Sequence, residues 1–173
     1  MKNLLSLLFV IAFSIGVSAQ TTSVKIYLGN SVQNPNSEDC GKVFAVTRQV
    51  PKTKAVARAA LEELFKGVTA EEKAKDFYST FSEESKSILI KLNIKRGAAY
   101  INFRGNTKDI LNGASSSCGS EAFFAQVEKT LKQFPTVKKV FYAIEGKPED
   151  FYDWMQIGEC PKELKNCSGK NFR

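Results

Sequence analysis

Histidine is absent from this chain of 173 residues, and other patterns that support catalysis are absent with it. Without an imidazole there can be no Ser–His or Cys–His nucleophile pair and no histidine ligand for a metal. The four cysteines include no C-x-x-C pair, which argues against a zinc site and against a redox-active dithiol. Neither Walker nor Rossmann spacing follows the Gly- and Ser-rich segment 113–120. We therefore expect no cofactor, no metal and a capping role for that segment.

Neighbouring carboxylates are present, but their spacing does not predict a catalytic pair. They stand at Glu62–Glu63, Glu71–Glu72 and Glu83–Glu84. Adjacent residues on a helix do not face each other, so solvated faces or helix caps explain these pairs. A glycosidase needs two carboxyls that converge at roughly 5–10 Å. An envelope-associated hydrolase or carbohydrate-binding protein that uses surface carboxylates remains the alternative hypothesis, and two carboxylates in one pocket would favour it.

Long apolar runs are also absent, except at the start of the chain. Lys2 is followed by an apolar stretch from Leu4 to Val17 and by the small residues 17–19, a pattern typical of a cleavable signal peptide over residues 1–19. A retained membrane anchor is the alternative, although the stretch is short for a span. No cysteine stands at the cleavage site, so we expect no lipid anchor. These features predict a secreted or periplasmic protein with no transmembrane segment after cleavage.

The mature chain is basic and retains every cysteine. The formal charge is +7 and falls to +6 when Lys2 is removed. Export and an even cysteine count predict two disulfides, for which three pairings exist. We favour Cys160–Cys167, which closes a short loop near the C-terminus, together with Cys40–Cys118. Anionic polymers could attract the basic chain, but dispersed charges can equally serve solubility.

Hydrophobic periodicity predicts one α+β domain with the order β-β-α-β-β-α-β. The two N-terminal strands are expected at 24–28 and 43–50, before a helix that is capped by Thr53 and stopped by Gly67. Thr69–Glu72 has the form of a capping box. A hairpin follows over 88–103, then a loop over 106–117. A helix from Cys118 to Phe134 stops before Pro135, and a strand over 137–144 closes the domain.

Five segments in this order resemble the GerMN domain family of sporulation and spore-germination proteins. They are Val46–Pro51, Ala57–Gly67, Thr69–Glu72, Asn93–Phe103 and Leu131–Val140 with Glu145–Lys147. The resemblance implies two helices packed on one face of a small mixed or antiparallel sheet, similar to the ring-building motif of secretion systems. It divides the chain into a signal peptide (1–19), a GerMN-like domain (20–147) and a cysteine-containing tail (148–173). The chain has one copy of the domain and adds the tail. We expect the aromatic residues of the tail to cover the domain, and its end, Lys162 to Arg173, to be flexible outside the cysteine loop.

The outer face of the hairpin is the predicted binding surface. If helices cover the apolar side, the other side is open and basic, and Lys25 and Tyr27 can join it. Its residues are Lys91, Asn93, Lys95, Tyr100, Asn102 and Arg104. An ordinary solvated sheet face is the alternative. The resemblance implies a non-catalytic binding or assembly module of the cell envelope, with a protein or envelope polymer as partner and with homo-oligomers possible. Export argues against nucleic acid.

Overall fold

The computed structural model describes residues 20–173, and it has the α+β class that the sequence predicts. The predicted signal peptide, residues 1–19, lies outside the described residues. In the described residues, no helix is both long enough and apolar enough to cross a membrane. The elements are β1 (Thr21–Asn30), β2 (Phe44–Pro51), α1 (Val56–Phe65), α2 (Ala70–Lys73), β3 (Phe77–Tyr78), β4 (Leu89–Lys95), β5 (Ala98–Phe103), α3 (Thr107–Ile110), α4 (Ser117–Lys132), β6 (Lys139–Ile144) and α5 (Pro148–Trp154).

The strands form two sheets of three strands each, where the sequence analysis expects a single sheet. The first has the order β2-β1-β3, and β1 pairs with β2 antiparallel from Thr21 opposite Pro51 to Leu28 opposite Phe44. The second has the order β4-β5-β6, in which β4 and β5 form the predicted antiparallel hairpin and β6 pairs parallel with β5. Strand periodicity predicts which side chains are buried but not which strands pair, so the division was not visible in the sequence.

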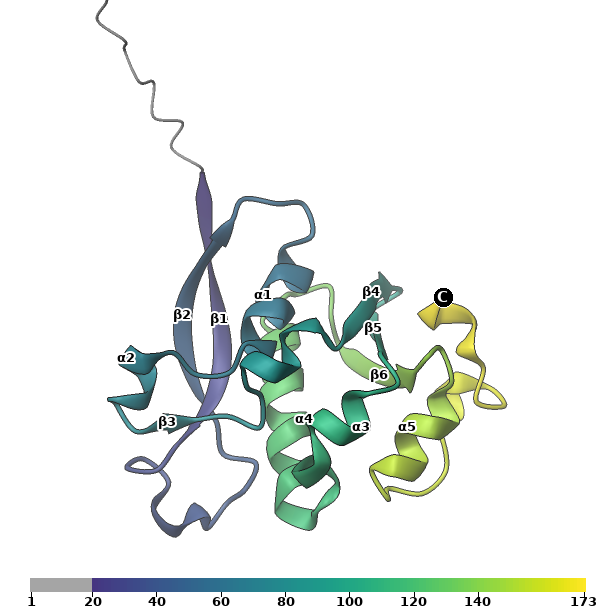
Figure 1. The fold of residues 1–173 in the computed structure, drawn as a ribbon. Helices are drawn as coiled ribbons and strands as arrows, with labels where there is room; N and C mark the ends of the chain where they lie inside the picture. Colours follow the sequence, from purple (N-terminus) through teal and green to yellow (C-terminus); the bar gives the residue numbers. More distant parts are fainter. Residues whose placement is uncertain (1–19) are drawn as a thin grey trace, which may run out of the picture.

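Helices α1 and α4 lie between the two sheets and bury side chains against both (Figure 1). On α1, the ring of Phe65 lies 5.8 Å from that of Phe103 on β5. On α4, Phe123 lies 6.0 Å from Tyr142 on β6. The apolar stripe of α4 that the sequence predicts is buried or half-buried in this core: Phe123, Phe124, Val127, Leu131 and Phe134.

The ends of the helices follow their local sequence in most places. The capping box is present, since Thr69 Oγ1 accepts from the Glu72 amide and the Glu72 side chain accepts from the Thr69 amide. Gly67 ends α1 with a φ of +73°, in the left-handed region that favours glycine. The predicted cap Thr53 is wrong, because α1 begins at Val56 and Thr53 Oγ1 accepts from the Ala55 amide before the helix.

Two disulfides join the cysteines in the pairing that the sequence analysis favours. Cys40 and Cys118 connect the loop after β1 to the first turn of α4, with a sequence separation of 78. Cys160 and Cys167 close a loop of the C-terminal segment, with a separation of 7. The segment 106–117, predicted to be a loop, contains α3 and a short 3₁₀ helix, Asn112–Ser115, before α4 begins.

The C-terminal segment is part of the packed structure, so the predicted flexibility after Lys162 is wrong. Helix α5 packs on β6, and the rings of Phe151 and Tyr142 stack at 4.7 Å. The chain then forms the 3₁₀ helices Lys162–Leu164 and Gly169–Phe172. Leu164 and Phe172 are buried in the same hydrophobic core as the strands, which fixes the end of the chain.

Candidate functional site

The C-terminal 3₁₀ helix Gly169–Phe172 covers part of the hairpin face that the sequence predicts to be open. The Tyr100 ring lies 5.4 Å from the ring of the fully buried Phe172. Asn93 Nδ2 donates to the carbonyl oxygen of Asn171 at 3.0 Å. The predicted face is therefore in the right strands, but these two residues contact the tail and are only partly exposed.

Asn102 is also withdrawn from solvent, because it holds the turn after β6. Its side chain is buried, and its Oδ1 accepts from the Gly146 amide at 2.7 Å. Gly146 has a φ of +76° and follows Glu145, which is also left-handed. A buried polar atom needs such a partner, so Asn102 has a structural role and is not available to a ligand.

Lysines remain exposed around the covered part, and the tail adds further cations. Lys91 and Lys95 alternate with Asn93 along β4, so they share the side of the sheet on which Asn171 lies. Lys170 and Arg173, in and after the last 3₁₀ helix, are exposed as well. We call these four residues the cationic face. The tail thus covers the aromatic and amide side chains but keeps the surface basic.

The other residues suggested for this face lie elsewhere. Arg104 is exposed, and its Nε donates to the carbonyl oxygen of Ser87 at 2.8 Å, which holds it near the start of β4. Lys25 and Tyr27 are on β1, in the other sheet. Tyr27 lines a shallow groove against α4 with Phe124 and Gln133. The sequence could not separate them from the hairpin because both sheets alternate in the same way.

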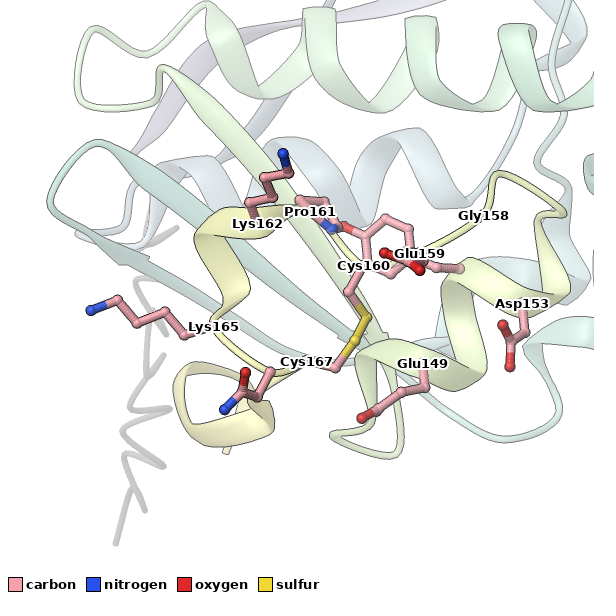
Figure 2. A pocket seen from close by; sticks show the side chains of 11 residues that line it. Glu149, Asp153, Gly158, Glu159, Cys160, Pro161, Lys162, Lys165 and Cys167 are labelled. Carbon is pink, nitrogen blue, oxygen red and sulfur yellow. A yellow bond between two sulfur atoms is a disulfide. The ribbon is translucent and has the colours of Figure 1, made fainter.

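A second candidate surface is a groove of about 750 Å³ beside α5, which the sequence analysis did not predict. Figure 2 shows the Cys160–Cys167 disulfide among the residues that line it. Charged residues of both signs surround the disulfide: Glu149, Asp153, Glu159, Lys162 and Lys165. The acidic cluster at 149–153 and the cysteine loop were the signals in the sequence, but their proximity depends on the path of the tail.

Three carboxylates line this groove. Two carboxylates in one pocket is the observation that would favour the alternative hypothesis of a hydrolase or carbohydrate-binding protein. Glu149 and Asp153 are one helical turn apart on α5, while Glu159 comes from the loop that follows. All three are exposed. Across the described residues, no group of three or more His, Cys, Asp or Glu side chains is placed to hold a metal ion. The groove can therefore offer charged contacts to a ligand, but it has no enclosed acid–base pair.

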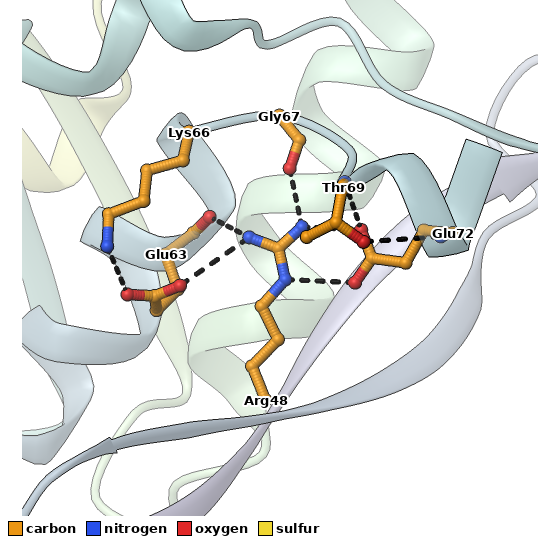
Figure 3. Close-up of polar contacts among 6 residues, drawn as sticks. All are labelled: Arg48, Glu63, Lys66, Gly67, Thr69 and Glu72. Atoms are coloured by element: carbon orange, nitrogen blue, oxygen red, sulfur yellow. Dashed lines mark hydrogen bonds and ion pairs between the residues drawn. The ribbon is translucent and has the colours of Figure 1, made fainter.

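At least one member of each adjacent carboxylate pair forms an ion pair, and Glu72 also has the capping role that the sequence predicts. Glu62 pairs with Arg58, and Glu83 pairs with Lys86, at the surface. The most buried case is Glu72, whose two oxygens accept from Arg48 Nε at 2.9 Å and Nη2 at 2.6 Å (Figure 3).

Arg48 connects β2 to the end of α1. Besides Glu72, it donates to the carbonyl oxygens of Glu63 and Gly67 (Figure 3). Burial raises the pKa of the Glu72 carboxyl, but the hydrogen bonds from Arg48 and from the Thr69 amide lower that pKa by more. The net pKa of Glu72 lies below its ordinary value, so the carboxylate stays ionised and holds the two segments together.

Two buried tyrosines, Tyr142 on β6 and Tyr152 on α5, are the other core residues whose pKa values are shifted. The hydroxyl of Tyr142 is fully enclosed and has no hydrogen-bond partner among the described residues. Burial raises the pKa of Tyr142 well above its ordinary value, and burial also raises that of Tyr152 to about 12. Both phenols are therefore neutral at physiological pH and are part of the apolar packing.

The comparisons with known proteins agree with this fold. Residues 25–150 match the model of the Germane family, which is described as sporulation and spore germination. The chain belongs to this family. The match ends within α5, so the disulfide loop and the last 3₁₀ helix lie beyond it. No curated protein sequence matches the chain.

Solved structures of the family have the same fold. The tandem GerMN domains of the sporulation protein GerM from Bacillus subtilis superpose with a TM-score of 0.54 at 23% identity, over 73% of this chain and 40% of that chain. The first GerMN domain of the same protein gives a TM-score of 0.50 at 24% identity, over 72% of this chain and 84% of that chain. This chain thus spans less than half of the tandem structure. The resemblance to GerMN domains that the sequence predicts is confirmed.

Proposed function

We propose that this protein is an exported, non-catalytic binding or assembly module of the bacterial cell envelope that acts in sporulation or germination. Membership of the Germane family carries the proposal. Two disulfides support an oxidising compartment outside the cytoplasm. The three adjacent carboxylate pairs of the sequence support a role without catalysis, since each contributes at least one member to an ion pair or a cap.

The cationic face is the surface through which we propose that the module binds its partner. Lys91 and Lys95 are exposed at the edge strand β4, and Arg104 extends the positive charge beyond β5. Lys170 and Arg173 come from the docked tail. Such a surface attracts an anionic envelope polymer or an acidic face of another protein, and its attraction weakens as salt is added.

A double charge reversal tests this surface. Lys91→Glu with Lys95→Glu should reduce capture of the partner from native envelope extracts after crosslinking, with no change in the unfolding transition. The matched control is Lys73→Glu with Lys129→Glu, two exposed lysines on α2 and α4 that change the net charge equally. Capture at the wild-type level by Lys91→Glu with Lys95→Glu would reject the cationic face as the binding surface. An equal loss of capture in this variant and in the control would also reject it, because it would show only an effect of net charge.

The second candidate is an envelope hydrolase or carbohydrate-binding protein, and the groove beside α5 is the observation that favours it. Glu149, Asp153 and Glu159 line this groove of about 750 Å³, a volume within the range of ligand sites. Turnover of a cell-wall polysaccharide by the pure protein, abolished by Glu149→Gln or Asp153→Asn, would establish the enzyme. Such a result would overturn the non-catalytic proposal.

A further inference from the structure

Within residues 20–173, strand β2 presents an unpaired edge that differs from the free edge of β1 and the outer edge of β4. Side chains at and after the end of α4 cap the free edge of β1. Gln133 Oε1 accepts from the Lys25 amide, and Gln133 Nε2 donates to the Lys25 carbonyl oxygen. Thr130 Oγ1 accepts from the Tyr27 amide. The outer edge of β4 carries Lys91 and Lys95, and Arg58 donates to its Ile90 carbonyl. Charge and side-chain caps are the usual protection of edge strands.

From Phe44 to Val50 the outer edge of β2 carries neither an exposed charge nor a side-chain cap, and only Pro51 at its end lacks an N–H. Figure 1 shows β2 on the far side of β1 from α4. Its eight residues pair with β1 without a bulge, and its one charged side chain, Arg48, is buried and paired with Glu72. Within residues 20–173, no hydrogen bond joins the outer edge of β2 to another segment.

The contacts of β1 determine which backbone groups point outward from β2. Lys25 and Tyr27 direct their backbone groups toward α4, so Val24, Ile26 and Leu28 direct theirs toward β2. The hydrogen-bonded partners of those three residues are Arg48, Val46 and Phe44. The alternate residues of β2 therefore turn their N–H and C=O groups to the open edge, and these are Ala45, Thr47 and Gln49.

We propose that a second copy of this chain pairs with β2 through the same strand, antiparallel and about a two-fold axis at Thr47. This register places Thr47 opposite Thr47 of the second copy and Ala45 opposite Gln49, so that the outward N–H and C=O groups of these three residues find partners. Arg48 then faces Val46 rather than a second arginine, and Val50 faces Phe44. The strand is thus complementary to itself in hydrogen bonding, and the register places no two charged side chains opposite each other.

The pairing joins the β2-β1-β3 sheet of one copy to the same sheet of the other, which gives a continuous sheet of six strands. The cationic face of each copy, on the other sheet, remains free. An isologous contact of this kind closes after two copies, unlike a head-to-tail contact that builds rings. A strand pair alone buries less surface than a standard interface, so the dimer should depend on protein concentration. This inference goes beyond the proposed function, because the dimer needs no envelope ligand. The dimer can therefore be shown or excluded whether or not the cationic face binds a partner.

A charge placed at the two-fold axis tests the pairing. Thr47→Glu should preserve the monomer, because Lys25 lies opposite position 47 on β1 and is a favourable partner for a carboxylate. Across the axis the two introduced carboxylates would repel each other, so the dimer dissociation constant should rise at least about tenfold. The control is Thr136→Glu, the same substitution at an exposed threonine outside the strands.

Sedimentation equilibrium over a range of concentrations should show a monomer–dimer equilibrium for the wild type and Thr136→Glu, and a monomer for Thr47→Glu. In the wild type, amide exchange at Ala45, Thr47 and Gln49 should slow as concentration rises, while Val46 and Arg48 are already protected by β1. A monomeric wild type at every concentration would overturn the proposal. A dimer that Thr47→Glu leaves intact, or protection confined to another strand, would do the same.

Discussion

Phe172 packs edge-on against Tyr100, with ring centroids 5.4 Å apart and an interplanar angle of 87°. This contact joins the C-terminal segment to the hairpin face, at positions 72 residues apart in the sequence. Phe172 is fully buried, and the backbone beside it bonds to Asn93. The family match ends at residue 150, so the segment that covers this face is an addition to the matched domain.

Phe172→Ala should lower the free energy of unfolding by about 3 kcal/mol, because it removes a buried ring and leaves a cavity against Tyr100. Urea denaturation of the oxidised protein measures the change. Arg173→Ala, at an exposed neighbour, is the control and should have little effect. A stability loss below about 0.5 kcal/mol for Phe172→Ala would show that the tail is docked only weakly.

Much of the fold could be predicted because the buried positions follow simple periods. Val24, Ile26 and Leu28 alternate on β1 and are all buried. The apolar residues of α4 recur at helical spacing and lie in the core. The capping box at Thr69 was also predicted, since it depends on local sequence, and the even cysteine count predicted two disulfides, which have the favoured one of the three possible pairings.

The sequence could not predict that the tail covers part of the predicted binding face, because this coverage depends on a long-range contact. Alternation along β4 and β5 correctly separates Tyr100 and Asn102 from the residues that face the helices. It gives no information on what covers them, and a single phenylalanine near the C-terminus has no periodic partner in the sequence. The binding role of Lys91 and Lys95 stays a prediction. The groove beside α5 was missed for the same reason.

Arg48 and Glu72 provide a second prediction. Arg48→Met should destabilise the fold by about 3 kcal/mol, because it leaves the buried Glu72 carboxylate and two backbone carbonyls without their donor. The double variant Arg48→Met with Glu72→Gln should recover part of this loss, since no buried charge remains. Strictly additive losses in the double-mutant cycle would contradict coupling between the two side chains.

The pH dependence of stability should also report on Glu72. Its folded pKa lies below the unfolded value, so the stabilisation is complete above the unfolded pKa and is lost as pH falls through the folded pKa. Glu72→Gln should therefore flatten the acid side of the stability profile relative to the wild type. Urea titrations repeated from neutral pH downward measure this, and parallel profiles for the two proteins would reject the assignment.

The two disulfides should differ in their contribution to stability. Loop closure predicts about 4 kcal/mol for Cys40–Cys118, with a separation of 78 residues, and about 2 kcal/mol for Cys160–Cys167, with a separation of 7. Paired serine substitutions measured by thermal unfolding give the comparison, after non-reducing peptide mapping has verified each bond. Free thiols in the mapped wild type, or the reverse order of stability, would contradict the prediction.

Tyr152 makes the fold sensitive to alkaline pH. Burial raises its folded pKa to about 12, while the phenol of an unfolded chain has an ordinary pKa of 10.0. Below the unfolded pKa the phenol is neutral in both states, so its stabilisation is complete. As pH rises from 10 toward 12 the unfolded state ionises first, and the stabilisation is lost progressively.

Tyr152→Phe should therefore reduce the difference in unfolding free energy between neutral and alkaline pH, whatever its effect at neutral pH. Burial raises the pKa of Tyr142 in the same direction, so Tyr142→Phe with Tyr152→Phe should flatten the alkaline profile further. Ultraviolet absorbance of tyrosinate, recorded beside the unfolding signal, shows whether ionisation and unfolding coincide. Ionisation of Tyr152 near the ordinary phenol pKa of 10.0 in the folded protein would mean that solvent reaches the phenol and that the fold does not bury it.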